Sequence, residues 1–371
     1  MTPPVFDDWH SPANHIAVNP SQPDAATGLA DFLTSQSLTH LCLFQTSGST
    51  GTPKWVALTK SAFLISAQAV NTHFEVTTDD HWLIALPLHH VGGFSILARA
   101  HLSHSRVTQT TAKWQPQDFA TLCEKERITL VSLVPAQVHD LVQARIPCPD
   151  TLRAAIIGGG AMSQSLADSA LALGWRVFQT YGMTEAASQI ATQPYNPFGP
   201  VFDVQSLEVL PHWQVSTSDS PLNSCLDPSL DALDRPLDPN LDKGSPLILS
   251  GPALSPGYAL RTADGTWHWD PIPPTGLVTR DLVRLWNHGT HQFLQFTGRD
   301  SGYIKILGEL IHLAPLQEQI ETLARQQGWP TPPGRVGGGG RRTWWFLSRL
   351  WKEVASLGFT RAGVSRPDRA L

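Results

Sequence analysis

The sequence predicts an α/β protein built mainly around a parallel β-sheet. Short apolar strands alternate with helical stretches up to about residue 195 of the 371-residue chain, and this alternation is typical of parallel α/β construction. Polar motifs directly follow several of these strands. Because such sheets bind ligands at the carboxyl ends of their strands, we expect one binding site along that edge.

Apolar runs and helical periodicity place the individual elements. Buried strands are predicted at 41–45, 82–86, 130–134, 155–157 and 177–180, and helices at 29–35, 61–73 and 94–101. Residues 203–245 are rich in Pro, Asp and Ser, so we predict loop for much of that segment. Short strands at 247–250, 282–286 and 293–296 predict a small antiparallel sheet or barrel.

Composition and charge argue against several classes of protein. The net charge of −5 disfavours a nucleic-acid surface, which needs clustered Lys and Arg. No apolar run approaches the roughly 20 residues that span a bilayer, and the first ten residues lack the pattern of a secretory signal. The four cysteines form no CxxC pair, which indicates reduced thiols. We therefore expect a cytoplasmic protein that binds neither nucleic acid nor membrane.

The stretch TSGSTGTPK, which ends at Lys54, predicts a phosphate-binding loop. Glycines let the backbone amides turn toward one point, hydroxyls add donors, and the lysine adds a point charge. It is not a Walker A loop, because Pro53 precedes the lysine and Trp55 follows it. The competing interpretation is a flexible Ser/Gly turn. The candidate phosphate ligands are Thr46, Ser47, Gly48, Ser49, Thr50, Gly51 and Lys54.

The hexamer TYGMTE at 180–185 supplies a carboxylate and an aromatic face. Glu185 offers hard oxygen ligands that suit Mg²⁺ between phosphate oxygens, and Tyr181 offers a flat surface on which a base can stack. The competing interpretation is a strand end followed by a helix N-cap at Thr184. This hexamer alone is weakly specific.

Three further groups of residues are candidates for ligand contacts. Asp281 can accept from two ribose hydroxyls and Arg299 can bind ribose or phosphate through its fork; the alternatives are a turn aspartate and a surface ion pair. His89 and His90 precede a Gly-Gly turn, which favours a pocket wall, with at least one of the two a packing residue. The third group is Gly158, Gly159 and Gly160. These glycines form either a tight turn or a segment whose backbone can come close to a flat ligand.

Taken together and in this order, TSGSTGTPK, YGMTE and GR…IK..GE resemble the motifs of the adenylate-forming (AMP-binding) superfamily. That superfamily includes acyl-CoA synthetases, peptide-synthetase adenylation domains and luciferases, and the resemblance covers roughly residues 41–320. LPLHHVGG and YGMTEAASQIAT are most similar to the o-succinylbenzoate–CoA ligases of menaquinone biosynthesis. The resemblance implies a large N-terminal domain over 1–300 with a β-rich, barrel-like subdomain over 203–300, and a C-terminal lid that starts at 301–331.

The resemblance also implies an activity and residue roles. The activity is ATP-dependent ligation of a carboxylic acid to coenzyme A through an acyl-adenylate, with Mg²⁺. His90 would lie at the acyl pocket, and Arg99 would face a second carboxylate of the substrate, whose burial without a partner would be costly. The loop up to Lys54 would bind the β- and γ-phosphates, Thr184 would contact the α-phosphate and Glu185 would bind Mg²⁺. Gly158–Gly160 and Tyr181 would surround the adenine, and Asp281 and Arg299 would bind the ribose.

The chain departs from the family pattern in four places. The segment before the phosphate loop is short, Arg280 stands where the family has glycine, and Ser301 occupies a hinge position. After Lys305 the only lysine is Lys352, which does not fit the family's catalytic lid motif. We therefore predict that the lid is truncated and that residues 332–371 form an aberrant tail.

Two alternatives to an o-succinylbenzoate ligase stay open. One is a ligase for another aryl or acyl carboxylate. The other is a nucleotide-binding pseudo-enzyme with a defective lid, which the tail favours, whereas intact Lys54, Glu185, Asp281 and Arg299 favour an enzyme. The sequence also leaves open whether the chain forms a homo-oligomer.

Overall fold

The computed structural model describes Phe6 and residues 8–46, 53–110, 113–196, 202–203, 206–217 and 244–299, with the backbone alone of 303–306 and 309–312. The predicted phosphate ligands Ser47–Gly51, most of the predicted lid start and the predicted tail lie outside these residues. The chain divides into two compact units, Met1–Ser301 with Lys305–Leu310 and Gly302–Ile304 with Ile311–Leu371. Strands β17 (Tyr303–Ile306) and β18 (Glu309–His312) each include residues of both units, and every other described element belongs to the first unit.

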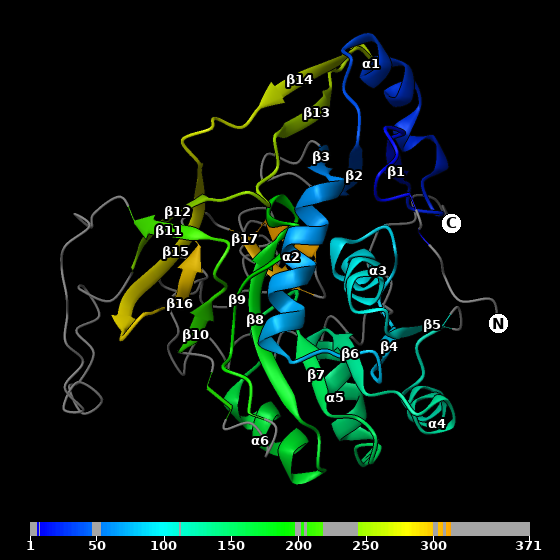
Figure 1. Ribbon diagram of the computed structural model, residues 1–371, viewed down its shortest axis with the longest axis vertical. Coiled ribbons are helices and arrows are strands. Elements are labelled where there is room, and N and C mark those ends of the chain that lie inside the picture. The colour runs from blue at the N-terminus through cyan, green and yellow to red at the C-terminus, as the bar shows by residue number, and fades with distance from the viewer. Residues whose placement is uncertain are drawn as a thin grey trace, which may run out of the picture. The chain divides into compact units, whose positions relative to one another are not determined.

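A parallel sheet forms the centre of the first unit (Figure 1). Four or more successive residues of its central strands are buried on both faces, which is why these strands are apolar runs without alternation. The strands, in spatial order, are β5 (Arg106–Gln109), β4 (His81–Ile84), β6 (Leu130–Leu133), β7 (Ala154–Ile157) and β8 (Val177–Met183). The predicted parallel α/β construction is confirmed.

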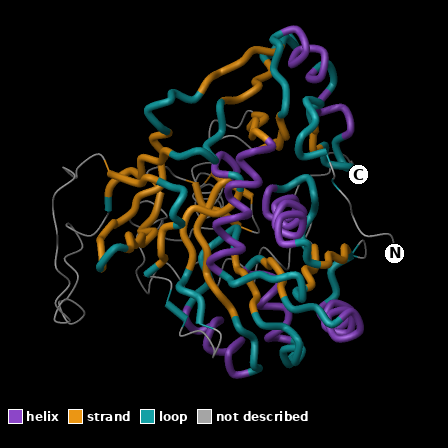
Figure 2. Tube along the Cα trace, viewed as in Figure 1, coloured by secondary structure: helices purple, strands orange, loops and turns teal. Residues whose placement is uncertain are grey.

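Helices cover both faces of this parallel sheet (Figures 1 and 2). On one face, α2 (Lys60–His73) and α3 (Val91–Ser103) bury Phe63 and Phe94 against Trp82 of β4. The opposite face carries α4 (Pro116–Glu126), α5 (Pro135–Gln143) and α6 (Gln164–Ala172). None of the described helices has the length and apolar character that a membrane span requires.

Antiparallel strands continue the sheet beyond β8. They are β9 (Ser188–Thr192), β10 (Leu207–Val209), β16 (His291–Arg299), β15 (Leu277–His288), β12 (Ser245–Ser250) and β11 (Gln214–Thr217). Two of these strands, β10 and β11, lie in the segment predicted as mostly loop, so that prediction is wrong there. Three- and four-residue strands are too short for their alternation to stand out among Pro, Asp and Ser. Residues 218–243 lie outside the described part.

A second sheet contains the two strands that precede and follow the predicted phosphate loop in the sequence. Its order is β1 (His15–Ala17), β2 (Leu41–Thr46), β3 (Lys54–Thr59), β13 (Gly257–Arg261) and β14 (Trp267–Pro271). Helix α1 (Leu29–Ser35) packs on it through buried Leu29 and Leu33, near η1 (Pro23–Ala26). The strands between 244 and 299 are thus antiparallel, as predicted, but they divide between two sheets.

Candidate active site

One buried side chain holds the glycine turn that follows β7. The carboxamide of Gln179 donates to the carbonyl oxygens of Ile157 at 3.2 Å and Gly160 at 3.1 Å, and it accepts from the backbone N–H of Met162 at 2.9 Å. Gln179 is 4% exposed. The turn that contains Gly158–Gly160 therefore has a fixed shape at the carboxyl edge of the sheet.

The TYGMTE motif ends in a tight β8–β9 hairpin. A Cβ atom at Gly182 would lie 1.7 Å from the carbonyl oxygen of Ser188, so the two backbones approach as closely as only glycine allows. Thr184 begins the short helix η2 (Thr184–Ala186), whose N-cap is Met183. The alternative interpretation of Thr184 as an N-cap is therefore wrong. The hairpin places Thr184 and Ser188 along one cavity.

The predicted phosphate lysine and the predicted metal ligand contact each other. Lys54 is in register with Thr46 across the β2–β3 hairpin, and its Nζ lies 2.9 Å from Oε1 of Glu185, with side chains that are 24% and 15% exposed. Burial raises the pKa of Glu185, but the charge and hydrogen bond of Lys54 outweigh it and the net pKa is lowered. Glu185 is thus held as a carboxylate, the hard ligand that Mg²⁺ prefers.

The two predicted ribose ligands are also paired. Asp281 and Arg299 face each other across β15 and β16, and Arg299 Nε lies 2.6 Å from Asp281 Oδ1. Tyr181 donates its hydroxyl to Asp281 Oδ2 at 2.7 Å, and its ring stacks on Phe296 at 5.7 Å between centroids. Burial and the Asp281 charge raise the pKa of Tyr181, which keeps this phenol a donor.

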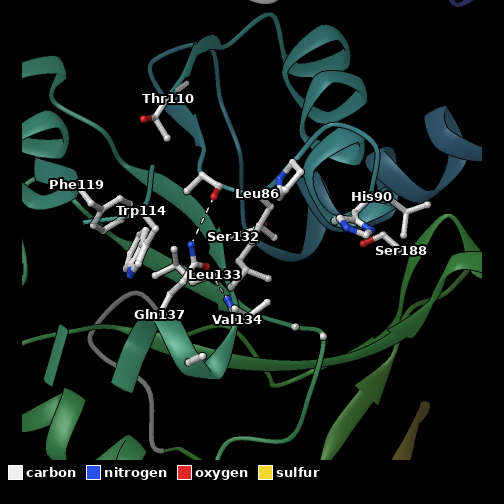
Figure 3. Close-up of a pocket in the computed structure, with 18 of the residues that line it drawn as sticks. Leu86, His90, Thr110, Trp114, Phe119, Ser132, Leu133, Val134, Gln137 and Ser188 are labelled. Atoms are coloured by element: carbon white, nitrogen blue, oxygen red, sulfur yellow. Dashed lines mark hydrogen bonds between the residues drawn. The ribbon is translucent and has the colours of Figure 1, made fainter. Parts of the chain in front are cut away.

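A cavity of about 940 Å³ opens at the carboxyl edge of the sheet between α3 and α5. In Figure 3, His90 and Ser188 lie close together on one side, Trp114 and Phe119 on the other, with residues of β6 between them. The structure brings five predicted site residues to its lining: His90, Arg99, Gly158, Gly159 and Thr184. The lining does not include Thr46, Lys54, Gly160, Tyr181, Glu185, Asp281 or Arg299.

Arg99 is a buried cation without an acidic partner among the described residues. Its side chain is 1% exposed, its Nε has no hydrogen-bond partner there, and its Nη1 makes only a long contact of 3.5 Å to Ser132 Oγ. Its guanidinium lies 5.5 Å from the ring of Trp82. Burial lowers the pKa of Arg99 to about 9, so the group stays protonated near neutral pH and the cavity contains a positive charge.

The two histidines of LPLHHVGG differ in surroundings. His90 is the N-cap residue of α3 and borders the cavity. The ring of His89 lies 4.5 Å from that of His90, and burial lowers the pKa of His89. His90 therefore takes the predicted place in the pocket wall.

Three residues of the site were not identified from the sequence. Ser132 and Gln189 both line the cavity. Ser132 contacts Arg99, and Gln189 is 3% exposed, with no hydrogen-bond partner for its Oε1 among the described residues. Lys54 Nζ lies over the ring of Tyr258, 3.8 Å from the ring centroid. The signal for Gln189 was the Ser-Gln pair after the motif, whereas nothing local marks Ser132 or Tyr258.

The glycine turn after β7, the Lys54–Glu185 pair and the Asp281–Arg299 pair all lie in the first unit, as the resemblance to the adenylate-forming superfamily implies. The profile of the family described as AMP-binding enzyme matches residues 14–258. The chain belongs to this family.

Within the family, several similar proteins are named as succinylbenzoate–CoA ligases or synthetases. The chain is 33% identical over 177 residues to a 2-succinylbenzoate–CoA ligase of Bacillus pumilus, covering 48% of this chain and 35% of that protein. It is 30% identical over 283 residues to one of Bacillus cereus, covering 76% and 54%. The Bacillus subtilis o-succinylbenzoate CoA synthetase with ATP and magnesium ion superposes with a TM-score of 0.56 at 26% identity, over 75% of this chain and 54% of that one. The chain thus spans about a third to a half of the relatives it matches.

Proposed function

We propose that this chain carries out ATP-dependent ligation of an aryl dicarboxylic acid, of the o-succinylbenzoate type, to coenzyme A. The names of its relatives support the reaction class. The observation that carries the choice of acid is Arg99, a buried guanidinium in the cavity with no acidic partner among the described residues. A buried unpaired charge is costly, and a second substrate carboxylate would remove that cost.

The residue roles are part of this proposal. Lys54 and the loop before it would bind the β- and γ-phosphates, and Thr184 the α-phosphate. Glu185 would hold Mg²⁺, which supplies charge neutralisation between phosphate oxygens when bound; one carboxylate plus substrate phosphates is a usual Mg²⁺ site. Asp281 and Arg299 would contact ribose, and Tyr181 with Gly158–Gly160 would frame adenine, Gly158 and Gly159 from the cavity lining.

The chemistry follows from charge placement. A substrate carboxylate oxygen bonds to the α-phosphorus as the bond to pyrophosphate breaks, and Lys54 offsets the charge that develops on the leaving oxygens. The thiolate of coenzyme A then bonds to the acyl carbon and AMP leaves. His90 would form the wall of the acyl pocket and Arg99 would fix the far carboxylate. ATP and coenzyme A are cytoplasmic substrates, which supports a cytoplasmic location.

ATP–pyrophosphate exchange tests the proposal. We expect exchange with o-succinylbenzoate and at least tenfold less with an analogue that lacks the succinyl carboxylate. Equal exchange with both acids would favour a ligase for another carboxylate. ATP binding without exchange by any acid would favour the pseudo-enzyme alternative.

A further inference from the structure

Tyr258 contacts both members of the Lys54–Glu185 pair. Its hydroxyl donates to Oε1 of Glu185 at 3.2 Å, the same oxygen that lies 2.9 Å from Lys54 Nζ. Its ring lies under the ammonium group, 3.8 Å from Nζ to the centroid. One half-buried side chain thus stabilises the anion by a hydrogen bond and the cation by its ring face.

The backbone around Tyr258 fixes this position. Tyr258 is in register with Val56, two residues from Lys54 on β3. Ser255 donates its backbone N–H to the carbonyl oxygen of Glu185 at 2.8 Å and its hydroxyl to the carbonyl oxygen of Ala57 at 2.6 Å. The segment that carries Tyr258 is therefore tied to both chain segments that supply the charged pair.

Nucleotide binding requires this pair to exchange partners. In the proposed function, which this inference assumes, Lys54 moves to phosphate oxygens and Glu185 turns to Mg²⁺. Each charge would then lose its present partner in a mostly buried place, where an unpaired charge is costly. Tyr258 contacts both, so neither would be left without an interaction.

We infer that Tyr258 is a positioning residue that orients Glu185 toward Mg²⁺ and supports Lys54 while the two charges exchange partners. The hydroxyl and the ring have separable tasks. The hydroxyl acts on the carboxylate and hence on Mg²⁺ affinity, whereas the ring acts on the ammonium and hence on nucleotide affinity. Groups that orient metal ligands typically change metal affinity about 10–100-fold when removed.

Calorimetric ATP binding by the full chain, without acid substrate and over a series of Mg²⁺ concentrations, tests the inference. Mg²⁺ should increase the ATP affinity of the wild type. For Tyr258→Phe we expect the Mg²⁺ concentration that gives half of this increase to rise about tenfold. Its ATP affinity in the absence of Mg²⁺ should stay within about threefold of wild type. Tyr258→Leu, which removes the ring as well as the hydroxyl, should weaken both the response to Mg²⁺ and the ATP affinity in the absence of Mg²⁺. In a Glu185→Gln background, Tyr258→Phe should have no further effect on Mg²⁺.

Tyr195→Phe is the matched control, since Tyr195 accepts a hydrogen bond from Arg153 Nη1 at 2.8 Å away from the Lys54–Glu185 pair. It should leave the Mg²⁺ series unchanged. If wild type binds ATP and Tyr258→Phe behaves like Tyr195→Phe, the inference is wrong and the proposed function stands. If wild type binds no ATP at any Mg²⁺ concentration, both are wrong. Should Tyr258→Leu fail to fold, the double variant with Glu185→Gln still decides the matter.

Discussion

The parallel sheet has an arginine near each end, and only the arginine at the amino end has an acidic partner among the described residues. At the amino end, Arg153 binds Asp80 through Nε at 2.7 Å and Nη2 at 2.8 Å, and Thr129 donates to the same carboxylate at 2.7 Å. At the carboxyl end, Arg99 is more buried than Arg153 and has no acidic partner among the described residues. Both arginines lie against the same sheet.

This difference separates the roles of the two arginines. A buried pair that satisfies its own hydrogen bonds needs nothing further, and breaking it destabilises the fold. A buried charge without a partner weakens the fold, so its presence calls for a ligand that supplies the partner. Changes at the amino end should therefore affect stability, and changes at the carboxyl end should affect activity.

The largest expected effect is that of Lys54→Ala, since Lys54 contacts Glu185 just beyond the carboxyl end of β8. Adenylation should fall about 10²–10³-fold, because the variant lacks a positive group at the reacting oxygens. The measurement is ATP–pyrophosphate exchange at saturating acid. Lys125→Ala is the control, since Lys125 is 75% exposed and pairs only weakly with Glu126 at 3.9 Å. A Lys54→Ala variant within tenfold of wild type would remove Lys54 from the phosphate site.

The same substitution at both arginines sharpens the comparison. Arg99→Met should raise KM for o-succinylbenzoate about 10²-fold, since a charge-assisted bond is worth about 1.5–3 kcal/mol, and should leave a monocarboxylic analogue nearly unaffected. The free energy of unfolding should not fall, because an unpaired buried charge is replaced by an apolar side chain. Arg153→Met should lower stability and leave KM alone. Equal KM losses for both acids would make Arg99 structural.

Asp80→Asn tests the amino end alone. Asp80 is 5% exposed, and removing one partner of a buried pair typically destabilises by about 3 kcal/mol or more. We expect a loss of about that size in urea unfolding, with kcat/KM of the folded variant within about threefold of wild type. A stable variant with poor activity would reverse the assignment of the two ends.

The smallest expected effect is the pH dependence of that same pair. Burial raises the pKa of Asp80, but the bonds from Arg153, Thr77 and Thr129 outweigh it, so the net pKa is lowered. A carboxyl whose folded pKa lies below its unfolded value of about 3.9 contributes stability above that value and loses it as pH falls through the folded pKa. Wild type and Asp80→Asn should therefore differ in unfolding free energy at pH 7, and the difference should shrink as pH falls below about 3.9 and through the folded pKa.

The sequence predicted four of the five parallel strands, β4, β6, β7 and β8, to within a few residues. Strands such as Leu130–Leu133 are buried on both faces, and this makes them apolar runs that need no knowledge of their neighbours. Helices α4, α5 and α6 and strands β3 and β5 were missed. The three helices are only nine to eleven residues long, and α4 and α5 open with proline. Strand β3 follows a polar loop with only six residues, and β5 has four residues at the edge of the sheet, none of them fully buried.

The sequence predicted which residues belong to the candidate site, but it did not predict which of them contact each other. Lys54 and Glu185 are 131 positions apart, and only the order of the sheets brings them together. The same holds for Tyr258, which reaches the pair because β13 joins β3. Motifs name groups suited to a chemistry, whereas their mutual pairing depends on topology that local patterns do not encode. The domain boundaries remain predictions.

The close approach of the two backbones in the β8–β9 hairpin restricts which substitutions the gene can accumulate at codon 182. Because a methyl group at Gly182 would overlap the carbonyl of Ser188, any base change in the first two positions of that codon yields a chain whose hairpin must open. A codon library over this segment, selected only for folded protein and never for catalysis, should still return glycine at 182. Loss of activity in some lineage would therefore leave the glycine in place long after Arg99, which carries no such constraint, had been replaced.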